Sequence, residues 1–141
     1  MIYSFTTDLG KISNKLTNQA TLISGTEDMI ANVALWDTGA TTSCISTDVV
    51  DRLNLKTIGQ KFVRTPAGQR ILNTYLLDVR LPNNVLVKDV MVIGTEIGNH
   101  GIDLLIGMDI IGLGDFSVSN FEGKTRFSFR IPSCEHADFA Q

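Results

Sequence analysis

The chain has 141 residues, of which 43% are hydrophobic, so it is long and apolar enough for one domain with its own core, and no second domain is expected. A formal net charge of -3 without a Lys/Arg cluster argues against a nucleic-acid-binding protein, because such proteins neutralise many phosphates. No apolar stretch approaches the roughly eighteen residues of a membrane span and the N-terminus lacks a signal-peptide pattern, so we expect a cytoplasmic protein with no membrane association.

The first half of the chain predicts strands interrupted by one short helix. The first twenty residues show no decisive pattern. Apolar runs at 20–24 and 29–36 flank the turn-prone segment 25–28, which predicts a β-hairpin. Thr47 is expected to cap a short helix, because Asp48 and an apolar pattern follow it directly.

A long projecting hairpin is predicted in the middle of the chain. Strand-like segments 60–64 and 70–79 flank the tetrapeptide 65–68, whose second residue is Pro and whose fourth is Gly. That order suits a type I turn.

The second half predicts further strands with one helical turn. The expected elements, in chain order, are a turn at 82–84, a β-branched strand at 85–93, a polar loop at 94–101, an apolar segment at 103–107, one or two helical turns at 108–113, and half-buried strands around 116–118 and 127–131.

One tetrapeptide stands out as a candidate catalytic site. Asp37-Thr38-Gly39-Ala40 follows the apolar run 31–36 and precedes a Thr/Ser-rich turn. A carboxylate on a tight glycine turn at the end of a buried strand is held rigidly, with backbone N–H groups nearby to stabilise its anionic form. Because Asp-Thr-Gly alone is a common turn tripeptide, the sequence around it decides the interpretation.

Two motifs in the same order resemble those of retropepsin-type aspartic proteases. They are WDTGATTSCIS and, further along, DLLIGMDII, and the resemblance covers about residues 28–132. Within this group the chain is more similar to small bacterial enzymes and to the protease domains of ubiquitin-shuttle proteins than to viral enzymes. The resemblance implies an all-β, closed barrel-like fold with one or two short helices. It also implies one domain over residues 1–141, with the tail 133–141 outside the resemblance.

The resemblance implies an aspartic endopeptidase that acts on extended segments of a peptide or protein substrate. Such chemistry needs two carboxyl groups that share one proton, and the chain has a single Asp-Thr-Gly. A C2 homodimer, with one Asp37 from each protomer, is therefore implied. The alternative is a catalytically inactive retropepsin-like module for peptide binding or dimerisation. A phosphate-binding loop of the actin-like ATPase type is disfavoured, because that fold needs a much longer chain.

The resemblance also assigns roles by position. Asp37 is the catalytic residue, and the loop around it is formed by Thr38, Gly39 and Ala40. The residues expected to pack beneath this loop are Leu104, Leu105, Ile106 and Gly107. The expected flap, which closes over substrate, has Thr65, Pro66, Ala67 and Gly68 at its tip.

The chain departs from the viral pattern at the positions of a dimer-bracing ion pair. Thr41 and Thr42 stand where viral enzymes have an acidic residue, and Gly107-Met108-Asp109 replaces Gly-Arg-Asn. We therefore expect other contacts to hold the dimer, with segment 125–131 as a candidate.

The cysteines and histidines give no sign of a metal or cofactor site. Cys44 and Cys134 are far apart and form no metal-ligand spacing with His100 or His136, so free thiols, no metal and no cofactor are expected. Cys44 is expected to be a packing residue rather than a nucleophile.

Overall fold

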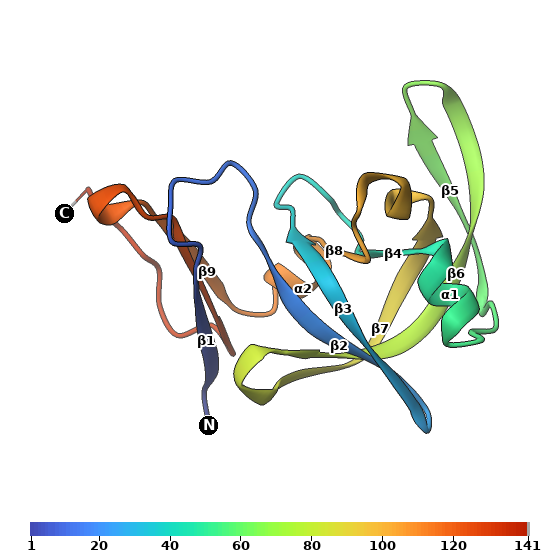
Figure 1. Ribbon diagram of the computed structural model, residues 1–141, viewed down its shortest axis with the longest axis horizontal. Helices are drawn as coiled ribbons and strands as arrows, with labels where there is room; N and C mark the ends of the chain where they lie inside the picture. The colour runs from blue at the N-terminus through green and yellow to red at the C-terminus, as the bar shows by residue number, and fades with distance from the viewer. Residues whose placement is uncertain (141) are drawn as a thin grey trace.

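The computed structural model describes residues 1–140, which form a mainly β protein with short helices (Figure 1). The strands are β1 (Tyr3–Asp8), β2 (Thr17–Ser24), β3 (Glu27–Trp36), β4 (Cys44–Ser46), β5 (Gly59–Thr65), β6 (Gly68–Leu81), β7 (Val85–Thr95), β8 (Leu104–Ile106), β9 (Asp115–Ser119) and β10 (Arg126–Ile131). The helices are α1 (Thr47–Arg52) and α2 (Met108–Ile111), with 3-10 turns η1 (Pro82–Asn84), η2 (Ile97–His100) and η3 (Phe121–Gly123). Within this described part, no helix has the length and apolarity to cross a membrane.

The larger sheet closes on itself as a barrel. Its strand order is β2-β3-β8-β4-β7-β6-β5, and an additional pairing of β2 with β6 closes six of these strands into a ring. The remaining strand, β5, pairs only with β6 and so extends beyond the barrel wall. The closed barrel and its two short α-helices confirm the predicted fold class.

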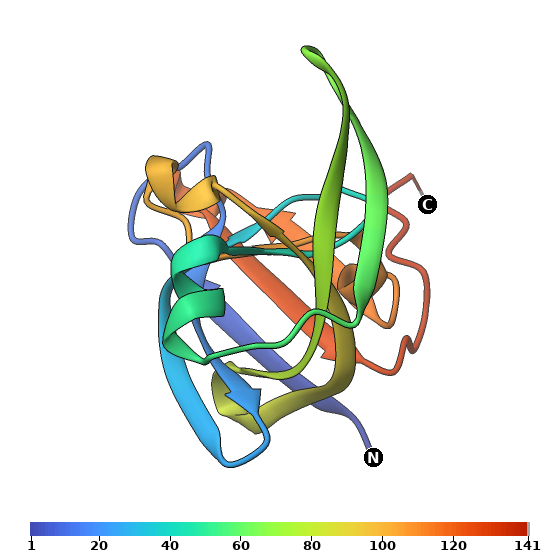
Figure 2. The same ribbon diagram turned by 90° about the vertical axis from the view of Figure 1, so that its right-hand side faces the viewer.

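The two predicted hairpins are present and are longer than the apolar runs that indicated them. Ser24 pairs with Glu27 across a two-residue turn in which Gly25 has a φ of +59°, a conformation that favours glycine. Thr65 likewise pairs with Gly68 across a two-residue turn, Pro66-Ala67. The β5–β6 hairpin projects away from the barrel, as Figure 2 shows.

The helix that follows the candidate catalytic loop starts one residue earlier than predicted. Its N-cap is Ser46, not Thr47, because Ser46 has the extended backbone of a cap and its hydroxyl accepts a hydrogen bond from Val49 N–H at 3.3 Å. Ser46 also ends β4, so one residue closes the strand and opens the helix.

A separate three-stranded sheet, which we call the terminal sheet, lies at the opposite end of the molecule from the projecting hairpin (Figure 1). Its order is β1-β10-β9, and β1 comes from the stretch that had no decisive sequence pattern. Segment 125–131, our candidate for dimer contacts, forms its central strand and uses both hydrogen-bonding edges within the protomer. Any dimer contact from this segment would have to come from side chains.

An aromatic cluster joins the terminal sheet to the barrel. The Trp36 ring stacks on Phe116 with centroids 5.3 Å apart and planes 5° from parallel. It also lies 5.5 Å from Phe5 and 5.2 Å from Phe129. Since Trp36 is the last residue of β3, this packing fixes the end of the strand that leads into Asp37.

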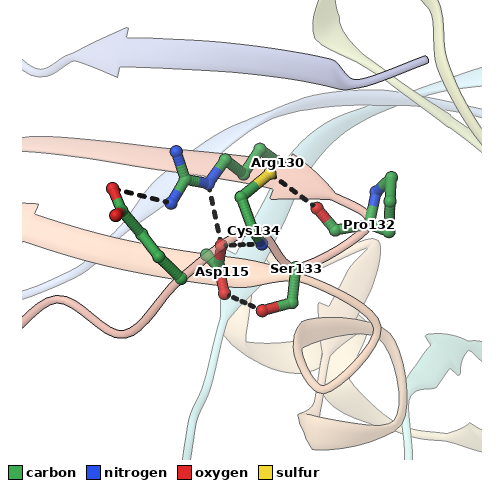
Figure 3. A network of polar contacts seen from close by, with 6 residues as sticks. Asp115, Arg130, Pro132, Ser133 and Cys134 are labelled. Carbon is green, nitrogen blue, oxygen red and sulfur yellow. Dashed lines mark hydrogen bonds and ion pairs between the residues drawn. The ribbon is translucent and has the colours of Figure 1, made fainter.

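The segment after β10 is attached to the terminal sheet by a polar network around Asp115 (Figure 3). Arg130 Nε donates to Asp115 Oδ2 at 2.8 Å, Cys134 N–H donates to the same oxygen at 2.8 Å, and the Ser133 hydroxyl donates to Oδ1. These donors, first the Cys134 N–H, lower the pKa of the Asp115 carboxyl. The network explains how residues outside the family resemblance have a defined position.

Candidate active site

The backbone fixes the position of Asp37 at the end of β3. Asp37 N–H donates to the Ile106 carbonyl at 2.8 Å, which ties the loop to β8. Gly39 N–H donates to Asp37 Oδ1 at 2.8 Å, and Ala40 N–H donates to the Asp37 carbonyl at 3.2 Å. The carboxylate is thus held by its own turn, as the sequence predicted, while Oδ2 accepts no hydrogen bond from residues 1–140.

The loop is open to solvent in a single protomer. Thr38 and Gly39 are exposed, whereas Asp37 and Ala40 are half-buried. A pocket of about 570 Å³ lies between the terminal sheet and residues 135–137, and Asp37 is not part of its lining. The one protomer therefore presents Asp37 on a surface rather than in an enclosed cavity.

Strand β8 lies beneath the loop, where the sequence placed it. Leu104 and Ile106 are fully buried, and β8 pairs in parallel with β3 so that Leu104 lies opposite Ala34 and Ile106 opposite Trp36. Leu105 points to the other side of the sheet and is half-buried. Segments 37–40 and 104–107 are thus brought together by strand pairing.

Gly107 allows the closest approach between these two segments. Its φ of -98° suits any residue, so backbone conformation does not require glycine here. The available space does require glycine, because a Cβ would lie 2.8 Å from the Ala40 carbonyl oxygen and 3.1 Å from the Thr42 carbonyl carbon. The same Ala40 oxygen accepts a hydrogen bond from Met108 N–H at 2.7 Å. A side chain at position 107 would therefore crowd the loop.

A polar bridge between the buried Ser43 and the exposed Asp109 also supports the loop, and sequence reasoning missed it. The Ser43 hydroxyl donates to Asp109 Oδ1 at 2.7 Å, and Ser43 N–H donates to Oδ2 at 2.9 Å. The hydroxyl also accepts from Gly107 N–H at 3.0 Å, and Ser43 has no exposed surface. The bridge joins the end of the segment 37–43, which we call the active loop, to the start of α2.

A row of half-buried apolar residues lies on one face of the strands around Asp37. Leu35 of β3 lies opposite Leu105 of β8, which in turn lies opposite Cys44 of β4. Burial raises the pKa of the Cys44 thiol, and the nearby Asp109 charge acts in the same direction. A raised pKa makes a poor nucleophile, which agrees with a packing role for Cys44. Both cysteines are free, and Cys134 is exposed.

The predicted flap tip is a tight turn at the end of the projecting hairpin. Thr65 Oγ1 donates to the Gly68 carbonyl at 2.8 Å, and Gly68 has a φ of +119°. Pro66 and Ala67 form the exposed tip, with negative φ as a type I turn requires. Among residues 1–140, no hydrogen bond joins the tip to loop 37–40.

One side chain from the base of the hairpin does reach the active loop. Lys61 Nζ donates to Thr42 Oγ1 at 3.0 Å. The sequence does not single out Lys61, because no local pattern predicts which face of a projecting strand lies near another loop.

No group of His, Cys, Asp or Glu side chains in residues 1–140 has the arrangement of a metal site. The Asp37 carboxylate is held at Oδ1 by Gly39 N–H, and its Oδ2 has no hydrogen-bond partner among the same residues.

A closed barrel with one Asp-Thr-Gly-Ala loop supported by an apolar strand and glycine is the architecture of retropepsin-like aspartic proteases. The family model for the gag-polyprotein putative aspartyl protease matches residues 23–112, and the chain belongs to this family. The match begins at the end of β2, includes β3 to α2 with the Asp37 loop and the β5–β6 hairpin, and ends before β9.

Two solved structures have a similar fold. A retropepsin-like aspartic protease from Rickettsia conorii has a TM-score of 0.57 and 12% sequence identity, over 92% of this chain and 95% of that one. The Simian Foamy Virus (mac) protease has a TM-score of 0.51 and 18% identity, over 69% of this chain and 92% of that one. No curated protein sequence matches the chain.

Proposed function

We propose that this protein is an aspartic endopeptidase whose active site forms at the interface of a homodimer. The observation that carries the proposal is the Asp37 carboxylate, held by backbone contacts on an open loop and present once per chain in an Asp-Thr-Gly sequence. The family and the fold support peptide hydrolysis as the reaction. A second copy, related by a two-fold axis, would bring the other carboxylate.

The reaction follows from two carboxyl groups that face one another. Two such groups about 3 Å apart retain one proton between them, because like charges this close cannot both be ionised. The ionised member accepts a proton from a bound water, which attacks the peptide carbonyl, while the protonated member donates a hydrogen bond to the carbonyl oxygen. The rigid turn at Asp37 would keep each carboxyl group in position without reorganisation.

The remaining predicted residues have supporting roles in this proposal. The exposed Thr38 would connect the two loops across the dimer axis, while Gly39 and Ala40 would line the peptide-binding cleft. The hairpin tip, Thr65 to Gly68, would close over an extended peptide. A cytoplasmic location is supported by the two free thiols, since reducing compartments keep cysteines unpaired.

Substitution of the proposed catalytic residue is the direct test. Asp37→Asn keeps the size of the side chain and should lower cleavage of a peptide library by about 100- to 10,000-fold, because general acid–base catalysis is lost. Its melting temperature should stay close to that of the wild type. The matched control is Asp51→Asn on the exposed surface of α1, which should cleave normally. An Asp37→Asn protein that cleaves as well as the control contradicts the assignment.

Dilution tests the shared site. Light scattering and cleavage should be measured on the same dilution series, and the rate per chain should fall as the dimer dissociates. A rate that stays proportional to chain concentration through the dissociation range contradicts the shared active site. Tight peptide binding by a wild-type dimer that never cleaves would favour the inactive binding module instead.

A further inference from the structure

The sequence around the flap has an unusual charge distribution. Residues 59–77 of the β5–β6 hairpin contain three of the chain's 12 Lys and Arg residues (Lys61, Arg64 and Arg70) and none of its 15 Asp and Glu residues. The chain as a whole has a formal charge of -3, so the hairpin is a positive element on a negative protein. A flap of this kind attracts negatively charged groups.

The strand register separates the hairpin side chains into two faces. Lys61 lies opposite Leu72 and Val63 lies opposite Arg70, so these four side chains share one face. Phe62 lies opposite Ile71 and Arg64 lies opposite Gln69, so these four share the other.

The Lys61 face is the one turned toward the active loop. Lys61 Nζ lies 3.0 Å from Thr42 Oγ1, five residues beyond Asp37 in the chain. Val63 on this face is half-buried, whereas Phe62 on the opposite face is 68% exposed. A peptide bound between the flap and the active loop would therefore meet Lys61, Val63, Arg70 and Leu72.

Both cations on this face lack an acidic partner. Within residues 1–140, neither Lys61 nor Arg70 forms an ion pair. The only side-chain hydrogen bond of Lys61 in that range is to the neutral Thr42 hydroxyl, which holds the ammonium group near the active loop. A carboxylate would be a stronger acceptor for the same ammonium group.

We propose that the flap selects peptide segments with an acidic side chain, and that this side chain binds to Lys61 beneath the hairpin. This inference rests on the proposed peptidase function. Arg70, on the same face and nearer the tip, would add to the attraction. Val63 and Leu72 would contact neighbouring apolar side chains of the peptide. Lys61 is thus a specificity-determining residue, and the substrate class is an extended acidic segment with apolar neighbours.

Binding to the Asp37→Asn protein tests this selection without depending on turnover. The probes are short fluorescent peptides on an Ala/Leu/Val background, in which a single Glu is moved along the sequence, each matched by a peptide with Gln at that position. At one position the Glu peptide should bind about tenfold more tightly than the Gln peptide, because a charged hydrogen bond is gained. The difference should shrink at high salt.

Two further substitutions locate the effect. Adding Lys61→Met should bring the Glu-to-Gln ratio below about twofold, because the remaining attraction is long-range and screened. The matched control is Arg64→Met, which removes a cation from the opposite face of the same hairpin and should retain the ratio. A ratio near one in the Asp37→Asn protein, or an unchanged ratio with Lys61→Met, overturns the inference.

The outcomes separate this inference from the proposed function. A wild-type protein that does not cleave, with a Glu preference that depends on Lys61, retains the inference and rejects the peptidase. Cleavage of Glu and Gln peptides with equal kcat/KM retains the peptidase and overturns the inference. Tight binding of a single-stranded oligonucleotide that is weakened equally by Lys61→Met and Arg64→Met, with no Glu preference, also overturns it, because the hairpin then binds polyanions in general.

Discussion

The active loop and the proposed flap are held in opposite ways. The loop is fixed by backbone hydrogen bonds to β8 and by the Ser43–Asp109 bridge. The flap is an exposed hairpin whose tip makes no hydrogen bond to the loop in residues 1–140, and Lys61 alone reaches across from its base. The part that would perform chemistry is therefore rigid, and the part that would admit substrate is free to move.

This difference gives an expectation for substitutions in each region. Changes beneath the loop should lower stability and activity together, because the carboxylate is positioned by the same contacts that hold the barrel. Changes in the flap should alter substrate binding and leave the free energy of unfolding nearly unchanged. The predictions below test that division, in order of decreasing effect.

Gly107→Ala should have the largest effect. The added Cβ meets backbone atoms of Ala40 and Thr42, which cannot rotate away, so the loop has to shift. We expect a loss of about 1–3 kcal/mol in the free energy of unfolding, with a large loss of cleavage. Urea denaturation and peptide cleavage measure both. The control is Gly123→Ala, in the η3 turn, where a Cβ meets nothing within 4 Å and the cost comes only from its φ of +73°. Similar losses of cleavage in the two variants would contradict the crowding argument.

Ser43→Ala should come next. It removes the hydroxyl that bridges Asp109 and Gly107 N–H and leaves that buried N–H without this partner. The expected loss is about 1–3 kcal/mol, measured by urea denaturation. The loss should be smaller in an Asp109→Asn background than in the wild type, because the two residues belong to one network. If the losses in the free energy of unfolding from Ser43→Ala and Asp109→Asn were additive, the two residues would not belong to one network.

Pro66→Gly should have a small effect on folding and a clear one on binding. Removing proline from the exposed tip increases the freedom of the unfolded chain and costs about 0.4–1 kcal/mol. A looser flap should raise KM for peptides. Pro82→Gly, in the turn between β6 and β7, is the matched control, because it has the same unfolded-state effect without touching the flap. Equal KM changes in the two variants would contradict a role for the tip.

Asp115→Asn should have the smallest effect on activity and a pH-dependent effect on stability. The pKa of Asp115 is lowered in the folded protein from an ordinary value of 3.8, so the unfolded chain binds more protons below that pH. The stabilisation is therefore complete above about pH 5 and declines as the pH falls through 3.8 and toward the folded value. Melting temperatures of wild type and variant should differ at neutral pH and converge in acid, with cleavage at neutral pH unchanged. A constant difference across pH would contradict the network as its source.

The loop and its floor could be predicted from the sequence because both lie in short, strongly patterned segments. Asp37-Thr38-Gly39-Ala40 forms its own turn, and a run as apolar as 104–106 is expected in the core, where Leu104 and Ile106 are buried. The flap hairpin was predicted because Pro66 and Gly68 give local turn signals. In each case neighbours in the chain carry the information.

The features that were missed depend on contacts between distant segments. Ser43 and Asp109 are 66 residues apart, and neither has a local pattern that indicates the other. Strand β1 lacked a decisive pattern because Phe5 is its one buried residue, and its pairing with β10 at the other end of the described chain has no local signal. The cap of α1 was misplaced by one residue because both Ser46 and Thr47 have hydroxyls, and only the extended backbone of Ser46 distinguishes them.

The pairing of β1 with β10 has a consequence for the order in which the molecule is completed during translation. Phe129 is synthesised more than a hundred residues after Phe5, against which it packs. Trp36, the residue before Asp37, also packs against Phe129. In a nascent chain, the aromatic packing that fixes Trp36, next to the proposed catalytic carboxylate, is therefore complete only after β10 has been synthesised.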